Sequence, residues 1–162
     1  MPHPQATRPH TQHFGGNRQP KRAENNQLPE SHPVSFFKDS PAKKQIDPIL
    51  LDKRASDLAA SFKKLKTTQM RRFYDELKAI ERKVFMGKDA QTQEANFQND
   101  RAMIVLFKAK AVYSEKRLVS PRAFTQFIFD HIDSIKDARD FQAFLKVFEA
   151  VVAFHRFFSE EN

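Results

Sequence analysis

Apolar residues recur at helical spacing through most of the chain after residue 46, and the last such stretch, Asp137 to Phe158, is the most apolar. Its apolar side chains fall three or four residues apart, and a second set fills most of the remaining surface. Only a narrow polar strip is left, through residues such as Gln142, Lys146 and Glu149. A helix that is apolar nearly all round is a buried one, so we expect this helix at the centre of a soluble bundle. Its ionisable residues argue against a membrane span.

Two helices are predicted before it in the first half of the domain. The first runs from Asp47 to about Leu65, with Asp47 as the N-cap and Pro48 at the first helical position. The second begins after Thr67 or Thr68 and ends before Gly87. Its apolar residues step by three and four, which is the spacing of a helix-packing face. These residues are Met70, Phe73, Leu77, Ile80 and Val84.

Two more helices complete the bundle. One runs from about Asp100 to Leu118, and residues 88–99 before it are expected to form a loop or a weak helical lead-in. Its apolar stripe is Met103, Leu106, Phe107 and Tyr113. The next begins at Ser120 and Pro121, an N-cap followed by proline, and Asp137 caps the last helix. No run alternates as a strand does, so the fold class is all-α: a five-helix bundle in residues 47–162.

Residues 1–46 have a different composition. They hold most of the prolines and histidines and much Gln and Asn, with a surplus of basic side chains. Such a segment cannot bury enough apolar surface to offset its ordering entropy, which predicts a disordered basic N-terminal arm. Phe36 and Phe37 form its one apolar pair, a candidate for docking on a neighbour.

Charge and composition narrow the function classes. The chain has 28 Lys and Arg against 20 Asp and Glu, a formal net charge of +8, which favours polyanionic partners, nucleic acid first. It contains no cysteine, so it has no thiolate metal site or disulfide framework, and only 3 glycines, which counts against Gly-rich phosphate loops. The first residues lack the apolar run of a signal peptide, so we expect a cytoplasmic protein.

The sequence shows no catalytic constellation. His131 and His155 lie on apolar stripes, where we interpret them as satisfied core or surface histidines rather than metal ligands. No HExxH pair, nucleophile elbow or recognisable carboxylate pair accompanies them. We therefore expect no enzyme, no cofactor and no metal. The 17 phenylalanines are interpreted mainly as core, with one or two base-stacking platforms as the alternative.

Basic residues lie along the second and third predicted helices. On the second they can be a solvated face paired with Asp75, Glu76 and Glu81, or a nucleic-acid face. On the third, Lys110 falls within the apolar stripe, so it must snorkel or meet an anion at the surface. Basic side chains interleaved with Tyr113 suit contact with a single-stranded backbone.

Three stretches carry a family resemblance. They are TTQMRRFY at 67–74, FKAKAVY at 107–113 with Arg117 four residues on, and FEAVVAFHRFF at 148–158. In this order and spacing they resemble the small subunit of the type III-A CRISPR effector, the Csm ribonucleoprotein of prokaryotes. The resemblance covers about residues 60–158. It departs from the family pattern at Phe154, where tyrosine is frequent, and at 114–116.

The resemblance implies a non-catalytic five-helix bundle. Copies of it self-associate by stacking beside the repeated backbone subunit that holds the CRISPR RNA, in a complex that also contains the large polymerase-like subunit. They line the groove where single-stranded target RNA pairs with the guide, in antiviral defence. Base pairing supplies the specificity, so the protein needs only contacts to the RNA backbone.

The family resemblance and the charge pattern of the helices each supply candidate site residues. By position, the basic residues of the family pattern correspond to Arg71, Lys108 and Arg117. Charge and helical position add Arg72, Lys78, Lys110, Lys116 and Arg122 as RNA-binding candidates. The apolar excess of the last helix suggests a subunit interface at Phe154, Phe157 and Phe158. Two other classes stay open: a basic protein-interaction module without a nucleic-acid role, and a peripheral membrane binder, which the arm's lack of an amphipathic face disfavours.

Overall fold

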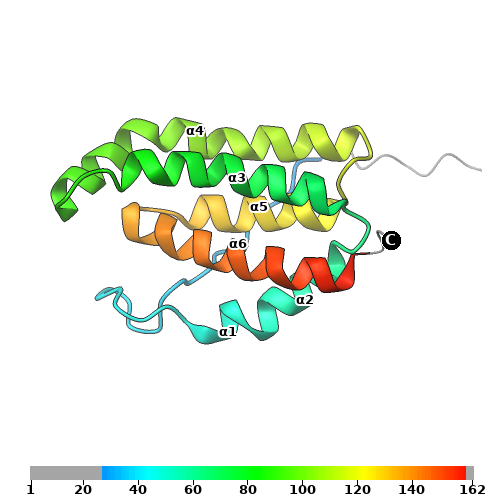
Figure 1. The fold of residues 1–162 in the computed structure, drawn as a ribbon, viewed down its shortest axis with the longest axis horizontal. Coiled ribbons are helices and arrows are strands. Elements are labelled where there is room, and N and C mark those ends of the chain that lie inside the picture. Colours follow the sequence, from blue (N-terminus) through cyan, green and yellow to red (C-terminus); the bar gives the residue numbers. More distant parts are fainter. Residues whose placement is uncertain (1–26, 160–162) are drawn as a thin grey trace, which may run out of the picture.

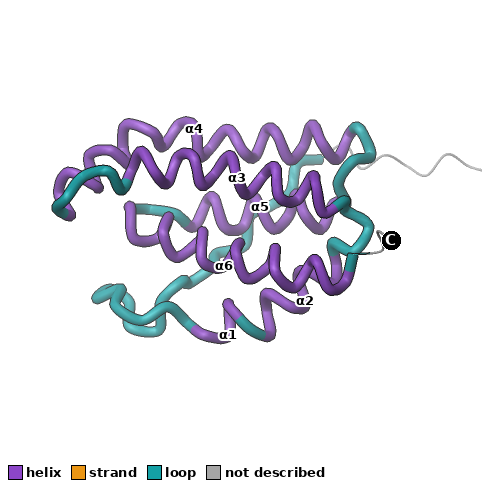
Figure 2. Tube along the Cα trace, in the orientation of Figure 1, coloured by secondary structure: helices purple, strands orange, loops and turns teal. Residues whose placement is uncertain are grey.

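The computed structural model describes residues 27–159, and these form an all-α bundle (Figures 1 and 2). Two short segments come first, α1 (Pro48–Leu51) and α2 (Lys53–Ser61). Four longer helices follow: α3 (Thr67–Val84), α4 (Ala90–Lys116), α5 (Arg122–Ser134) and α6 (Ala138–Phe158). Together α1 and α2 correspond to the first predicted helix, which breaks at Asp52. The predicted fold class is confirmed.

The C-terminal helix α6 occupies the centre, as its composition predicts. It packs against α1, α2, α3 and α4, and its phenylalanines meet those of α5. The core is a cluster of phenylalanine rings: Phe127 contacts Phe62, Phe144 and Phe148 at centroid distances of 5.2 to 6.0 Å. Interior phenylalanine therefore joins the C-terminal end of α2 to α5 and α6, and the interpretation of phenylalanine mainly as core is confirmed.

Helix α3 agrees with its predicted apolar pattern, whereas α4 does not. All five apolar residues predicted for the packing face of α3 are buried. Helix α4 begins at Ala90, ten residues earlier than expected, with the Asp89 carboxylate accepting the backbone N–H of Thr92 at 2.8 Å. Of the predicted α4 stripe only Phe107 is buried. The residues that α4 buries are Phe97, Ile104, Phe107, Ala111 and Ser114.

Two of the three predicted N-caps form hydrogen bonds. The Asp47 carboxylate accepts the N–H of Ile49 at 3.1 Å, and that of Asp137 accepts the N–H of Asp140 at 2.9 Å. The prediction for Ser120 is wrong: Pro121 is the cap residue of α5, and the Ser120 hydroxyl is buried without a hydrogen-bond partner in the described chain. Its backbone N–H instead donates to the Ser114 carbonyl, which closes the turn after α4.

Residues 27–46 differ from the expected disordered arm. They form a strap, here the N-terminal strap, that runs from beside α4 past α5 to a loop near α6 (Figure 1). Phe36 is 3% exposed, with its ring centroid 6.0 Å from that of His131, so it docks in its own bundle rather than on a neighbour. Residues 1–26, which are the rest of the predicted arm, lie outside the described residues.

An ion cluster fixes the far end of the strap. Lys43 Nζ lies 2.6 Å from an Asp137 carboxylate oxygen and 2.9 Å from one of Asp140. Burial opposes the charge on Lys43, but the hydrogen bonds to both carboxylates outweigh it, so the pKa of Lys43 is raised. Charge-assisted hydrogen bonds of this kind are stronger than neutral ones, which explains how a proline-rich segment holds one position.

Candidate nucleic-acid interface

A groove between α3 and α4 gathers basic and aromatic side chains. Gln69, Arg72 and Glu76 reach it from α3, at positions three and four residues apart that share one helix face. From α4 and its C-cap come Lys110, Tyr113, Ser114 and Arg117, again at helical spacing, while Phe73 and Val119 complete the lining. The groove, hereafter the α3–α4 groove, has a volume of about 500 Å³.

One carboxylate, that of Glu76, organises the basic groups of the α3–α4 groove. Lys110 Nζ hydrogen-bonds to it from across the groove, and Arg72 Nε lies 3.9 Å away. Lys110 Nζ also lies 4.8 Å from the ring centroid of Phe107. Lys110 thus meets an anion at the surface, the second of the two outcomes expected for a lysine within an apolar stripe. Two cations on one partly exposed acid leave the site net positive.

Tyr113 and Arg117 line the groove with exposed side chains. Tyr113 is 64% exposed, and the Arg117 guanidinium carbon lies 5.5 Å from its ring centroid. An exposed aromatic face can stack on an unpaired base, and a guanidinium can bind phosphate through two hydrogen bonds. The groove therefore combines a stacking surface with three cations, which are the groups that bind a nucleic-acid strand without reading its sequence.

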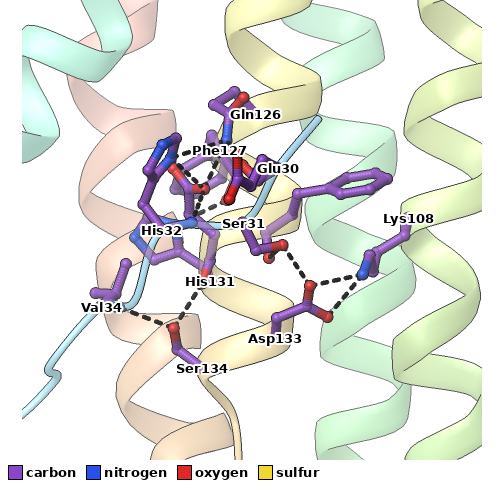
Figure 3. Close-up of polar contacts among 12 residues, drawn as sticks. Glu30, Ser31, His32, Val34, Lys108, Gln126, Phe127, His131, Asp133 and Ser134 are labelled. Atoms are coloured by element: carbon purple, nitrogen blue, oxygen red, sulfur yellow. Dashed lines mark hydrogen bonds and ion pairs between the residues drawn. The ribbon is translucent and has the colours of Figure 1, made fainter. Parts of the chain in front are cut away.

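The other predicted RNA-binding residues lie elsewhere. Lys108 turns toward α5, with its Nζ 2.7 Å from the Asp133 carboxylate and 4.4 Å from the Phe129 ring centroid (Figure 3). Burial opposes the charge on Asp133, but the hydrogen bonds from Lys108 and from the Ser31 hydroxyl, with the charge of Lys108, outweigh it, so the pKa of Asp133 is lowered. Lys108 thus stabilises the contact of α4 with α5 and, through Asp133, with Ser31 of the strap.

Three more candidates also lie outside the groove. Lys78 pairs with Glu81 on its own helix, and Arg122 Nη1 lies 3.3 Å from Glu115. Arg71 lines a separate cavity between α3 and α6, beside Arg156. The three positions matched by the resemblance therefore occupy three different places: Arg71 faces α6, Lys108 faces α5, and Arg117 lies in the groove.

The last candidate, Lys116, lines an apolar groove on the other side of Tyr113. Ala102, Val105, Leu106 and Val112 of α4 form this surface with Leu28 of the strap and Phe129 of α5. Of the eight candidates the structure thus brings together Arg72, Lys110 and Arg117. Sequence reasoning missed Gln69 as a lining residue and the central place of Glu76. Their helical spacing with Arg72 was the only sequence signal that placed Gln69 and Glu76 on the same face of α3. The contact of Glu76 with Lys110 of α4 could not be predicted, because it depends on how the two helices dock.

The predicted interface phenylalanines are unequally exposed. Phe157 is 83% exposed, and its ring lies 5.1 Å from that of Phe158. Phe154 and Phe158 are partly buried against the bundle's own core. Phe157 is therefore the member of the set whose side chain the fold leaves exposed.

The two core histidines are satisfied by backbone carbonyls, as predicted. Nδ1 of His131 lies 2.8 Å from the Phe127 carbonyl oxygen, and Nε2 of His155 lies 3.1 Å from that of Phe62. Burial lowers the pKa of His131 to about 4, so it is neutral near neutral pH.

Within residues 27–159, no group of three or more His, Asp or Glu side chains is arranged to hold a metal ion. No helix in that range is long and apolar enough to span a membrane.

Comparison with known families decides the relationship. The family model described as Csm2 Type III-A matches residues 45–161, which is most of the chain. The chain belongs to the Csm2 family. Membership makes it a small subunit of the type III-A CRISPR complex, associated with other Csm subunits. No curated protein and no solved structure matches the chain. The Csm2 match begins at residue 45, so the N-terminal strap up to Lys44 precedes the matched region.

Proposed function

We propose that this Csm2-family protein is a non-catalytic subunit that holds the backbone of target RNA, paired with CRISPR RNA, without sequence specificity. It acts in antiviral defence in the cytoplasm, beside the repeated backbone subunit, the large polymerase-like subunit and stacked copies of itself. The family match and the net charge of +8 support this role. The observation that carries it is the α3–α4 groove, with three cations around an exposed tyrosine.

The chemistry of the groove fits backbone contact. Arg72 and Arg117 offer planar guanidinium groups for phosphate oxygens, and Lys110 adds a point charge. Glu76 holds Lys110 and Arg72 in place and is displaced as a partner when phosphates arrive. Because such contacts release counterions and read no base edges, affinity should depend on salt and hardly on sequence.

A salt titration with matched variants tests the groove. The Arg72→Ala/Lys110→Ala/Arg117→Ala variant removes its three cations. The control Lys53→Ala/Lys64→Ala/Lys146→Ala removes three exposed cations elsewhere, on or after α2 and on α6. Binding of single-stranded RNA is measured by fluorescence anisotropy across salt concentrations. For the groove variant, the slope of log affinity against log salt should fall by about 2, at roughly 0.7 per phosphate contact. For the control it should change little.

Equal slopes for the two variants contradict the assignment of the RNA surface to the α3–α4 groove. Strong preference of the wild-type protein for one RNA sequence contradicts backbone recognition itself. Because the side chains substituted in the two variants are exposed or half-buried, both variants should retain the wild-type unfolding midpoint, which circular dichroism checks.

A second candidate function, a protein-interaction module, has one specific observation in its favour. Val105 and Leu106 of α4 are 47% and 44% exposed and border the apolar groove that Leu28 and Phe129 complete. An apolar surface of this kind is typical of a protein-docking site. Purification of the protein in a stable complex with a protein partner after nuclease treatment, together with failure to bind RNA, favours this function over the first.

A further inference from the structure

Ser114 of α4 has a buried hydroxyl group that the fold itself does not use. The residue is 6% exposed, and its Oγ has no hydrogen-bond partner in the part of the chain that the structure describes. Buried hydroxyl groups in proteins are nearly always hydrogen-bonded, because an unpaired one has lost its bonds to water and gained none in return. A partner that binds from outside removes this cost.

The position of Ser114 places this hydroxyl in the deeper part of the α3–α4 groove. Lys110 and Arg117, four residues before and three residues after it, line the same groove, so the serine lies between two cations on one helix face. Gln69 reaches the groove from α3, which packs beside α4 (Figure 1). Arg117 is exposed and Lys110 is half-buried, whereas Ser114 is buried, so a group that reaches Ser114 passes between the two cations.

The backbone of Ser114 is fixed by the turn that ends α4. Its carbonyl oxygen accepts the backbone N–H of Val119 at 3.0 Å and that of Ser120 at 3.4 Å. These bonds hold the main chain in place without occupying the side chain. The hydroxyl can therefore bind a ligand at little further ordering cost, and rotation about its own bonds lets it donate or accept.

We propose that Ser114 hydrogen-bonds to a ribose 2′-hydroxyl of the strand bound in the α3–α4 groove, so that the groove binds RNA in preference to DNA. The inference rests on the proposed function. In a strand each sugar joins two phosphates, and Ser114 lies between cations that the proposed function assigns to phosphates. The 2′-hydroxyl is the group that lets a protein distinguish RNA from DNA, and it both donates and accepts, as serine does.

The depth of Ser114 favours a sugar hydroxyl over a phosphate. Lys110 and Arg117 are about 10 Å apart along the helix axis, at roughly 1.5 Å per residue, so they reach different phosphates of one strand. Burial of a charged phosphate oxygen beside Ser114 costs more than burial of a neutral hydroxyl that gains a hydrogen bond. A base edge is the third polar group of a strand, and it is the same in RNA and DNA of equal sequence.

The test compares RNA with DNA as ligands of the full-length protein. Ser114→Ala removes the hydroxyl. The matched control is Ser120→Ala, because Ser120 is also 6% exposed and its Oγ also lacks a partner in the described chain, but it does not line the groove. The probes are fluorescent oligouridine and oligodeoxyuridine of equal length, which differ only in the 2′-hydroxyl. Fluorescence anisotropy gives the dissociation constant of each probe.

Ser114→Ala should weaken RNA binding by roughly 2- to 10-fold, the effect of one neutral hydrogen bond, and should leave DNA binding unchanged. The preference for RNA over DNA should fall by the same factor, while Ser120→Ala should keep the wild-type preference. An unchanged preference in Ser114→Ala overturns the inference, even where both affinities fall together, because that result indicates a base contact, a phosphate contact or altered packing. An equal loss of preference in the two serine variants overturns it as well.

The groove variant, which lacks Arg72, Lys110 and Arg117, separates this inference from the function on which it rests. Ser114→Ala removes no cation, so its slope of log affinity against log salt should match the wild type. If the groove variant lowers that slope and Ser114→Ala keeps the wild-type preference for RNA, the proposed function stands and the inference fails. If the groove variant keeps the wild-type slope, the assignment of RNA to the groove fails and the inference fails with it.

Discussion

The buried histidine of α5 makes stability depend on pH in a way that can be calculated from the structure. His131 is 6% exposed, packed between the rings of Phe36, Phe127 and Phe144. Burial is the largest influence and lowers its pKa to about 4. The Phe127 carbonyl and Asp130 oppose this effect, while Arg54 of α2 adds to it. Acidification forces a charge into this apolar site or unfolds the chain.

The sign and size follow from the two pKa values. The unfolded chain protonates His131 near the ordinary value of 6.5, and the folded chain protonates it only near 4. Between those values the unfolded state binds more protons, so the stability from neutral His131 is complete above pH 6.5 and is lost as the pH falls toward 4. From about pH 7.5 to about pH 5 the loss is about 2 kcal/mol.

Urea unfolding of wild-type protein and two non-titrating variants measures this loss. His131→Gln keeps a polar side chain near the Phe127 carbonyl, and His131→Leu fills the site with an apolar one. All residues other than 131 are the same in the three proteins, so their contributions cancel in the comparison. The free energy of unfolding of the wild type should therefore fall by about 2 kcal/mol more than that of either variant. Equal pH dependence in all three proteins refutes the assignment of a lowered pKa to His131.

Two further predictions concern the strap and the end of α4. Phe36→Ala, which empties a site that is 3% exposed, should destabilise the protein by about 3 kcal/mol in urea unfolding. A change within experimental error contradicts the docking of the strap. Leu118 has a φ of 58° and is 93% exposed, so Leu118→Gly relieves left-handed backbone strain without loss of packing. It should stabilise the protein by about 0.5 to 1 kcal/mol, visible as a higher thermal midpoint, and a lower midpoint contradicts the reasoning.

The helices could be predicted wherever polar and apolar faces contrast. In α3 the buried apolar residues lie on one face and mostly charged or polar residues cover the rest, so its buried face is readable from spacing alone. Helix α4 is apolar on two sides: Ile104 and Phe107 are buried, while Met103 and Leu106 beside them are 49% and 44% exposed. Periodicity cannot choose between such faces, because the choice depends on where the neighbouring helices dock.

The strap and the groove could not be predicted for a related reason. Residues 27–46 are rich in proline and polar side chains, a composition typical of disorder, yet Phe36 and Lys43 anchor them to the bundle. Each anchor depends on a site made by α5 or α6, about a hundred residues away in the sequence. Likewise the α3–α4 groove requires Glu76 to meet Lys110 across two helices. The family pattern selected three basic candidates, and charge with helical position selected five more. Neither could separate the candidates that share a surface from those paired elsewhere.

Photo-crosslinking in the assembled Csm complex tests the central claim most directly. Target RNA carrying 4-thiouridine is bound, irradiated and digested, and the crosslinked peptides of this subunit are identified by mass spectrometry. The account predicts crosslinks in peptides that contain Gln69 to Glu76 of α3 and Lys110 to Val119 at the end of α4, which line the groove. Crosslinks confined to α2 and α6, or none to this subunit while neighbouring subunits crosslink, would contradict it.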